Sequence, residues 1–244
     1  MTTPQARASA VVALVEAEPP SAQLGSTSVV SWLNRLCQAT VRALPATGAG
    51  ISLITEAGVG AVTTASDEVS RTLEELQFTL GEGPCMDAFA TGRPVLVPDV
   101  AGDAAGRWPA YCSDARGRGV RAVFAFPLQI GSARLGAMDV FRDQVGPLSS
   151  AEVARALLFA EVATMTLLDG QEHARDGQPA GLGEPLDTSL EVYQAQGMVM
   201  VALGVSLVEA LARIRAYAYA NDRRLGSVAR DIVNCTLSLE RDEP

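Results

Sequence analysis

The side chains that could act as nucleophiles or metal ligands are few in this sequence and lie far apart. There are four cysteines and a single histidine: Cys37, Cys85, Cys112, Cys235 and His173. Zinc sites usually draw on cysteines a few residues apart, as in a Cys-x-x-Cys pair, and haem sensors usually need a histidine. No such pair occurs, so the sequence predicts reduced, mostly buried thiols and no zinc, iron, flavin or other cofactor.

A second set of chemically capable residues combines arginine with tyrosine near the C-terminus. Two arginine–tyrosine pairs are each four residues apart, which places both members on one helix face. Guanidinium planes and tyrosine rings stack on unpaired bases, which suits an RNA hairpin loop. The alternative is an ordinary solvated face, because residues 190–236 hold five arginines against four acids. The candidate RNA-binding residues are Gln194, Gln196, Arg213, Arg215, Tyr217, Tyr219, Arg223 and Arg224.

The composition of the 244 residues is that of a globular protein, with 48% hydrophobic and 19% charged side chains. The net charge of −9 argues against a protein that coats nucleic acid non-specifically, but a local basic site remains compatible with it. All 19 cationic residues are arginine, so every cationic contact is a planar guanidinium fork. No apolar run reaches the roughly 18 residues of a membrane span, and no secretory signal is evident, so we expect a cytoplasmic protein.

The hydrophobic pattern divides the chain into a mixed N-terminal part and a helical C-terminal part. Residues 1–28 read as a flexible leader. Helices and strands then alternate within 29–173, up to a long helix capped by Ser149 or Ser150 together with Glu152. Glycine and proline are dense in 174–189, which predicts a linker. Three helices follow within 190–240, with breaks at Gly204 and at 221–222.

The long helix carries apolar and small residues at spacings of four, three, four and three: Val153, Leu157, Ala160, Thr164 and Leu167. This heptad seam predicts a homodimer with these helices near the interface. A seam this short could equally pack on its own sheet.

The order of elements in the N-terminal part, together with four short motifs, resembles the GAF family of sensor domains. The motifs are Gly81-Glu82-Gly83-Pro84, Gly92-Arg93-Pro94, Pro127-Leu128 and Leu135-Gly136-Ala137. The resemblance implies an α+β fold: an antiparallel sheet with helices on one face and a ligand pocket on the other. The ligand would be an unknown small molecule or protein signal, because this fold serves many ligands.

Two features of this part have competing interpretations. Gly81-x-Gly83 resembles a phosphate cradle, but Pro84 lacks an amide donor, which favours a turn that fixes the next helix. The candidate ligand-pocket residues either line a pocket or belong to a surface loop anchored by the tryptophan. They are Cys85, Arg107, Trp108 and Tyr111.

The C-terminal helices resemble the ANTAR domain, a three-helix RNA-binding module of transcription antitermination regulators. The resemblance rests on residues 194–200, Leu203-Gly204-Val205-Ser206, Glu209-Ala210, Ile214-Arg215, Ala218, 221–225 and Val228-Ala229. It implies a regulator that binds hairpins in nascent RNA and is not an enzyme.

Two other functions stay open at this point. One is a thiol enzyme similar to GAF-type free methionine sulfoxide reductases, although the closely spaced cysteines that such chemistry favours are missing. The other is a ligand sensor whose helical domain binds a protein. Turnover of free methionine sulfoxide would identify the first, and a protein partner without RNA binding would identify the second.

Overall fold

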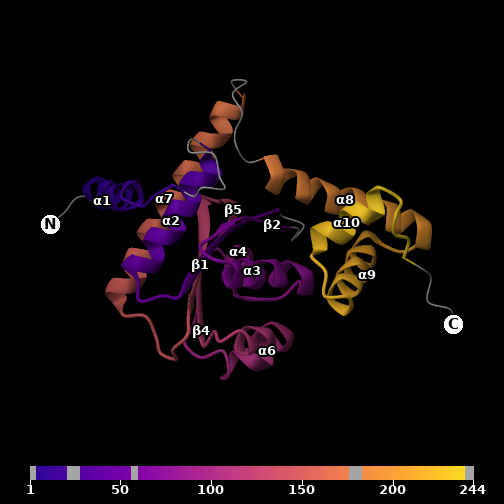
Figure 1. Ribbon diagram of the computed structural model, residues 1–244, viewed down its shortest axis with the longest axis horizontal. Helices are drawn as coiled ribbons and strands as arrows, with labels where there is room; N and C mark the ends of the chain where they lie inside the picture. Colours follow the sequence, from indigo (N-terminus) through magenta and orange to yellow (C-terminus); the bar gives the residue numbers. More distant parts are fainter. Residues whose placement is uncertain (1–3, 21–27, 56–59, 176–182, 240–244) are drawn as a thin grey trace.

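A computed structural model describes residues 4–20, 28–55, 60–175 and 183–239 (Figure 1). The N-terminal part contains a sheet and seven helices among these residues, and the C-terminal part contains three helices. The fold is α+β, as predicted, but the expected arrangement with helices on only one face of the sheet is wrong, because helices cover both faces. The first elements are α1 (Pro4–Glu16), α2 (Val29–Ala43), β1 (Gly48–Ile54), β2 (Gly60–Ala65), α3 (Glu68–Leu80), α4 (Pro84–Thr91), β3 (Val95–Val97), α5 (Ala104–Arg107) and α6 (Pro109–Gly117). The others are β4 (Ala122–Ile130), β5 (Ala133–Arg142), α7 (Ser150–Arg175), α8 (Gly183–Leu203), α9 (Leu207–Ala220) and α10 (Leu225–Val233).

The five strands form one antiparallel sheet in the order β2-β1-β5-β4-β3. The central strands β1, β4 and β5 are apolar along most of their length and buried on both faces. Such strands need cover on both sides, and helices supply it.

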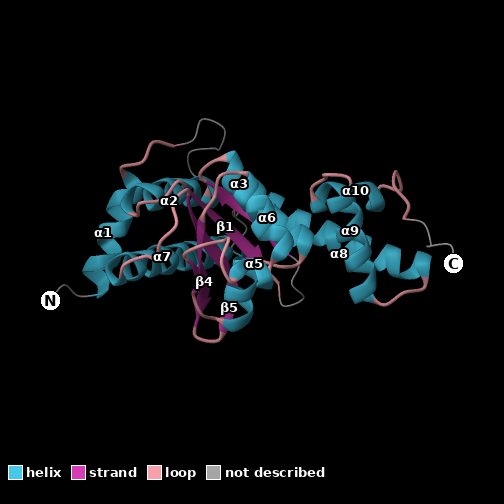
Figure 2. Ribbon diagram, turned by 90° about the horizontal axis from the view of Figure 1, so that it is seen from below, coloured by secondary structure: helices cyan, strands magenta, loops and turns pink. Residues whose placement is uncertain are grey.

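The helices form separate layers on the two faces of the sheet (Figure 2). One face is covered by α1, α2 and α7, whose core includes Leu33, Leu36 and Phe159. The other face is covered by α3, α4 and α6, with Leu73 and Tyr111 in a second core. The bundle of α8, α9 and α10 lies beyond this second helical layer, against α3 and the β2 end of the sheet.

Helix boundaries follow local capping chemistry. At the start of α7 the amide of Ser149 donates to Glu152 Oε2 at 2.6 Å, and the Glu152 amide donates to Ser149 Oγ at 3.3 Å. This is the predicted reciprocal cap, which satisfies amides that a helix start leaves free. Ser206 caps α9 by accepting from the Glu209 amide at 3.2 Å. The predicted turn at 81–84 is also confirmed, because Gly81 ends α3 and Pro84 is the first residue of α4.

The two segments expected to lack structure contain helix. Within 1–28, α1 packs on α2 and α7 and buries Val11 and Val15, four residues apart. That pair is too short a signal to predict a helix, and it becomes stable only where α2 and α7 accept it. The expected linker 174–189 is entered by α7 up to Arg175 and by α8 from Gly183, while 176–182 lie outside the described residues.

The predicted seam of α7 divides between two environments. Ala160, Thr164 and Leu167 are buried inside the N-terminal domain, where α7 contacts α1, α2 and β4. Leu157, by contrast, is 42% exposed. Most of the heptad pattern is therefore explained by packing within one chain, and only its outer edge remains available for a homodimer.

No single helix among the described residues is long and apolar enough to cross a membrane. Residues 190–203 and 207–220 pass that test only as a pair, and the two segments are bent by 106°.

Candidate RNA-binding face and its contact with the sensor helix

The three C-terminal helices share a core of aliphatic side chains. Gln196 lies at the edge of this core and is only 8% exposed. Its Nε2 donates to the carbonyl of Leu207 at 2.7 Å, which ties α8 to the first turn of α9. This predicted RNA-binding residue is thus used inside the bundle, and we leave it out of the proposed RNA surface. The core residues are Val192, Ala195, Val199, Ala210, Leu211, Ile214, Ala218, Leu225, Val228, Ala229 and Ile232.

The core of the bundle continues into the N-terminal domain. Ile54, Phe78 and Phe89 belong to the same buried cluster as the bundle residues. On the polar edge of this contact, Thr55 Oγ1 and the Tyr193 hydroxyl are 2.6 Å apart. The two parts of the chain therefore meet through an apolar interface, in which α9 lies along α3.

Arg215 projects from α9 to the C-terminal end of α3. Its Nε donates to the carbonyl of Phe78 at 2.9 Å. The carbonyls of the last helical turn lack partners within their own helix and carry the negative end of its dipole, so a guanidinium stabilises them. Burial lowers the pKa of Arg215 from its ordinary value, although the group stays charged. A predicted RNA contact is therefore engaged by the N-terminal domain.

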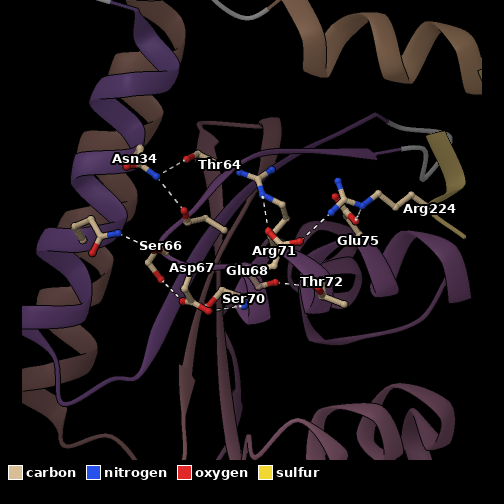
Figure 3. A network of polar contacts seen from close by, with 12 residues as sticks. Asn34, Thr64, Ser66, Asp67, Glu68, Ser70, Arg71, Thr72, Glu75 and Arg224 are labelled. Atoms are coloured by element: carbon tan, nitrogen blue, oxygen red, sulfur yellow. Dashed lines mark hydrogen bonds and ion pairs between the residues drawn. The ribbon is translucent and has the colours of Figure 1, made fainter. Parts of the chain in front are cut away.

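Arg224 makes a second charged contact with α3 (Figure 3). Its Nη2 lies 2.9 Å from Glu68 Oε1, and its Nε lies 3.0 Å from Glu75 Oε2. Burial raises the pKa of Glu75, whereas the charges of Arg224 and Arg71 act in the opposite direction. Arg224 thus bridges two carboxylates that lie two turns apart on the same face of α3.

A cleft of about 630 Å³ opens between the N-terminal domain and the C-terminal helical bundle, where α3 and α6 face the end of α9. Tyr219, Arg223 and Arg224 line it together, which is the combination of ring and guanidinium that the sequence predicted for RNA. Tyr219 is 50% exposed, so part of its side chain is accessible to a ligand in the cleft. The wall carries three arginines and three acids: Arg118, Arg223, Arg224, Glu75, Asp114 and Asp222. The cleft is therefore close to neutral in this arrangement.

The remaining predicted residues lie elsewhere on the bundle. Arg213 pairs with Glu209 on its own helix at 3.1 Å. Tyr217 is partly buried against the bundle core. Gln194 borders a shallow apolar depression that includes Met198 and Val201. Arg223, although it lines the cleft, is also held by Asp231 at 2.5 Å. The structure therefore brings three of the eight predicted residues together.

Comparison with known proteins assigns both parts of the chain. A GAF domain profile matches residues 26–168, which is more than half of the chain, and an ANTAR domain profile matches residues 180–233. The chain is a GAF–ANTAR protein. A GAF sensor domain followed by an ANTAR RNA-binding domain is the order found in signal-responsive antitermination regulators, and this architecture is typical of regulators rather than enzymes.

Solved structures show the fold of the GAF domain. The GAF domain of a phosphoenolpyruvate-protein phosphotransferase from Coxiella burnetii is 14% identical, with a TM-score of 0.51, and the match covers 70% of this chain and 96% of that one. The GAF domain of the corresponding Acinetobacter protein is 10% identical, with a TM-score of 0.50, and the match covers 72% and 99%. No curated protein matches the chain.

The candidate ligand-pocket residues of the GAF domain separate into two groups. Trp108 is buried in the core of α5 and α6, and Arg107 lies outside it, with its guanidinium carbon 4.6 Å from the centre of the tryptophan ring. Arg107 also pairs with Asp87 on the surface. Cys85 and Tyr111 instead turn inward, toward a buried polar cluster between α3, α4, α6 and the sheet.

The acids of this buried cluster, Glu74 on α3 and Asp139 on β5, were missed by sequence reasoning. Val69 and Leu76 are apolar at helical spacing on α3, but the buried face of this helix includes Ser70, Glu74 and Gln77 and leaves Val69 exposed. The one signal in the sequence that could have pointed to this site is the single acid, Asp139, within the apolar run Ala137–Phe141.

The three cysteines of the GAF domain do not have the environment of reactive thiols. Cys37, Cys85 and Cys112 are buried, and burial raises the pKa of each. Reactive cysteines are partly exposed and have lowered pKa values, because the thiolate is the nucleophile. This environment gives the thiol-enzyme hypothesis no support.

Proposed function

We propose that this GAF–ANTAR protein binds a hairpin in nascent RNA through its ANTAR domain and so prevents an alternative terminator hairpin from forming. The mechanism is competition between RNA structures, without chemistry on the RNA. The observation that carries this proposal is the cleft where Tyr219, Arg223 and Arg224 converge on an ANTAR domain. A ring for base stacking beside guanidinium groups for phosphate is the chemistry of loop recognition. The protein would act in the cytoplasm as a homodimer.

The arrangement described above is the inactive state, in which the GAF domain has not received its signal. Arg224 is neutralised by Glu68 and Glu75, and Arg215 is engaged by the carbonyl of Phe78. An RNA phosphate approaching this cleft meets acids that already hold the cations, and it is repelled by them. A small-molecule or protein signal in the GAF domain that shifts α3 would free both arginines for RNA.

The contacts on α3 provide a direct test. Glu68→Gln/Glu75→Gln removes the acids that compete with phosphate, so it should raise the affinity for RNA. Glu161→Gln/Asp143→Asn makes the same change in net charge at exposed positions outside this cleft and should leave affinity unchanged. The RNA is obtained by crosslinking in the protein's own cells and sequencing, and affinity is measured by fluorescence anisotropy with the recovered hairpin.

The stacking contact is tested on the same hairpin. Tyr219→Ala should weaken binding by about 5–150-fold, the equivalent of one lost base stack of about 1–3 kcal/mol. Tyr219→Phe keeps the ring and should bind nearly as well as the wild type. A folded Tyr219→Ala/Arg224→Ala protein with full affinity would exclude this cleft, and recovery of a protein partner without any RNA would favour the interaction-sensor hypothesis.

A further inference from the structure

Three side chains that are distant in the sequence meet in the interior of the GAF domain. They come from three elements: Glu74 from α3, Cys85 from α4 and Asp139 from β5. Their potential ligand atoms, two carboxylate oxygens and a thiol sulfur, all lie within 4.8 Å of one another. Each of the three residues is completely buried. Two acids are an unusual content for a protein core, where charged groups are paired or bind metal ions.

Each carboxyl group has one oxygen in a hydrogen bond and one without a partner. Ser52 Oγ donates to Glu74 Oε2 at 2.6 Å, and Gln77 Nε2 donates to Asp139 Oδ2 at 2.7 Å. The other two oxygens, Glu74 Oε1 and Asp139 Oδ1, are buried and lack hydrogen-bond partners. One oxygen oriented by a neighbour and one left open is the pattern of a carboxylate that binds a metal ion.

Tyr111 on α6 provides an independent observation. Its hydroxyl is completely buried and also lacks a hydrogen-bond partner. It lies close enough to the cluster that Asp139, Glu74 and Cys85 all raise its pKa, after the larger effect of burial. Buried hydroxyls are nearly always hydrogen-bonded, so an open hydroxyl near a cluster that also holds two open carboxylate oxygens supports a missing ligand in this region.

A ligand that contacts both open carboxylate oxygens would be expected to carry a positive charge. No guanidinium contributes to the pKa of either acid of the cluster. Burial and the neighbouring carboxyl group both raise the pKa of Glu74, and the same two acids raise that of Cys85. All four side chains are electron-pair donors, and nothing among the described residues balances them if they ionise.

We propose that Glu74, Cys85 and Asp139 bind one divalent transition-metal ion of the zinc type. A thiolate ligand selects zinc and related metals over magnesium and calcium. Tetrahedral zinc, with bonds of about 2.0–2.3 Å, places its ligand atoms about 3.3–3.7 Å apart, which a small contraction of the cluster achieves. Binding releases the thiol proton and any proton held by the two carboxyl groups to solvent.

The backbone around the cluster is shaped to hold these side chains. A Cβ at Gly50 on β1 would lie 2.5 Å from Glu74 Oε1, so only glycine lets the carboxylate lie on the sheet. Gly83 does the same for Gln77, whose Oε1 also accepts from the Cys85 amide at 2.8 Å. The turn at 81–84 therefore positions the proposed ligand Cys85. It also positions the Gln77 side-chain amide, which orients the second ligand, Asp139.

The expectation of a chain without zinc rested on residue spacing in the sequence, and spacing cannot detect ligands from three separate elements. The site also lies on α3, where Glu74 points inward and the adjacent Glu75 holds Arg224. Transmission from metal to RNA along α3 rests on the proposed function, whereas the metal site itself does not.

The test measures metal binding by the full chain without RNA. Protein treated with EDTA is dialysed against zinc, and bound metal is measured by mass spectrometry. The expected result is one zinc per chain, retained in excess magnesium and calcium. Cobalt should bind in its place and give the near-ultraviolet absorption of a cobalt–thiolate bond, which reports Cys85 directly.

The variants separate this site from other metal-binding groups. Cys85→Ser should abolish the cobalt–thiolate absorption, and Glu74→Gln or Asp139→Asn should each weaken zinc binding at least tenfold. Matched controls are Cys112→Ser and Glu75→Gln, which should bind like the wild type. Both acid variants remove a buried charge, so they should fold, as circular dichroism would confirm. Substoichiometric zinc in the wild type would overturn the proposal, and the two acids would then only share a proton. Zinc binding at wild-type strength by the Glu74→Gln/Asp139→Asn protein would also overturn it.

Discussion

Replacing Asp139 by asparagine should change how the stability of the metal-free protein depends on pH. Burial raises the pKa of the Asp139 carboxyl from its ordinary 3.8 to about 7. The folded protein therefore keeps a proton that the unfolded chain releases between about pH 4 and pH 7. Since the folded state binds more protons in this window, the free energy of unfolding falls as the pH rises through it.

The size of the effect follows from the same shift. One pKa unit corresponds to about 1.4 kcal/mol, so a shift of about three units sets an upper limit of roughly 4 kcal/mol on the loss. Glu74 shifts in the same direction, so its own loss of stability adds to that of Asp139. Asparagine keeps an oxygen for the Gln77 amide and adds an amide donor for the open oxygen of Glu74. Asp139→Asn should therefore be more stable than the wild type at pH 8, by about 1–4 kcal/mol, and similar to it near pH 4.

Urea unfolding followed by circular dichroism, with EDTA present and the pH varied from 4 to 8, measures this difference. Asp143→Asn is the control, because Asp143 lies four residues after Asp139 at an exposed position. This variant should follow the wild type. A wild-type protein whose stability stays level or rises over this range would refute the reasoning. So would an Asp139→Asn protein that is less stable than the wild type at pH 8.

Three further predictions concern packing. Leu157→Glu, at the exposed edge of α7, should shift a homodimer toward monomer in light scattering, and an unchanged dimer mass would place the interface elsewhere. Gly83→Ala should lower the free energy of unfolding by about 1–3 kcal/mol, because Gly83 has a φ of 141°; Gly117→Ala, in open space, should not. Ile214→Ala, in the core shared by both domains, should cost about 2–5 kcal/mol in chemical unfolding, and a loss below 1 kcal/mol would contradict that packing.

Features that depend on a few neighbouring residues could be predicted from the sequence. The cap formed by Ser149 and Glu152, the helix end at Gly204 and the turn that leads into Pro84 all appear in the structure as expected. In each, the hydrogen bonds or backbone angles are decided within four or five residues of chain. The same locality explains why the order of strands and helices was predictable.

Features that depend on tertiary contact were out of reach. Gln196 resembles a surface amide in the sequence and is buried only because α9 starts beside it. In the sequence, Arg215 has the spacing of a surface cation. Only the fold shows that its guanidinium contacts the C-terminal end of α3. Glu74 interrupts an apolar helix face, and nothing near it in sequence reveals that Asp139, 65 positions later, lies opposite. The sequence therefore predicted the types of residue in the candidate RNA cleft. It did not predict which of these residues line the cleft or which contact the GAF domain.

The bond from Arg215 to the carbonyl of Phe78 has an evolutionary consequence. A main-chain carbonyl is present whatever side chain occupies a position, so substitutions at residue 78 leave this acceptor in place. The contact recognises the end of a helix rather than a residue type. The contact is sensitive to substitution at two positions. One is Arg215 itself, and the other is Gly81, where an added Cβ would lie 2.6 Å from the guanidinium. The docking of the two domains can thus persist while the sequence of α3 drifts, provided that the helix ends at the same residue.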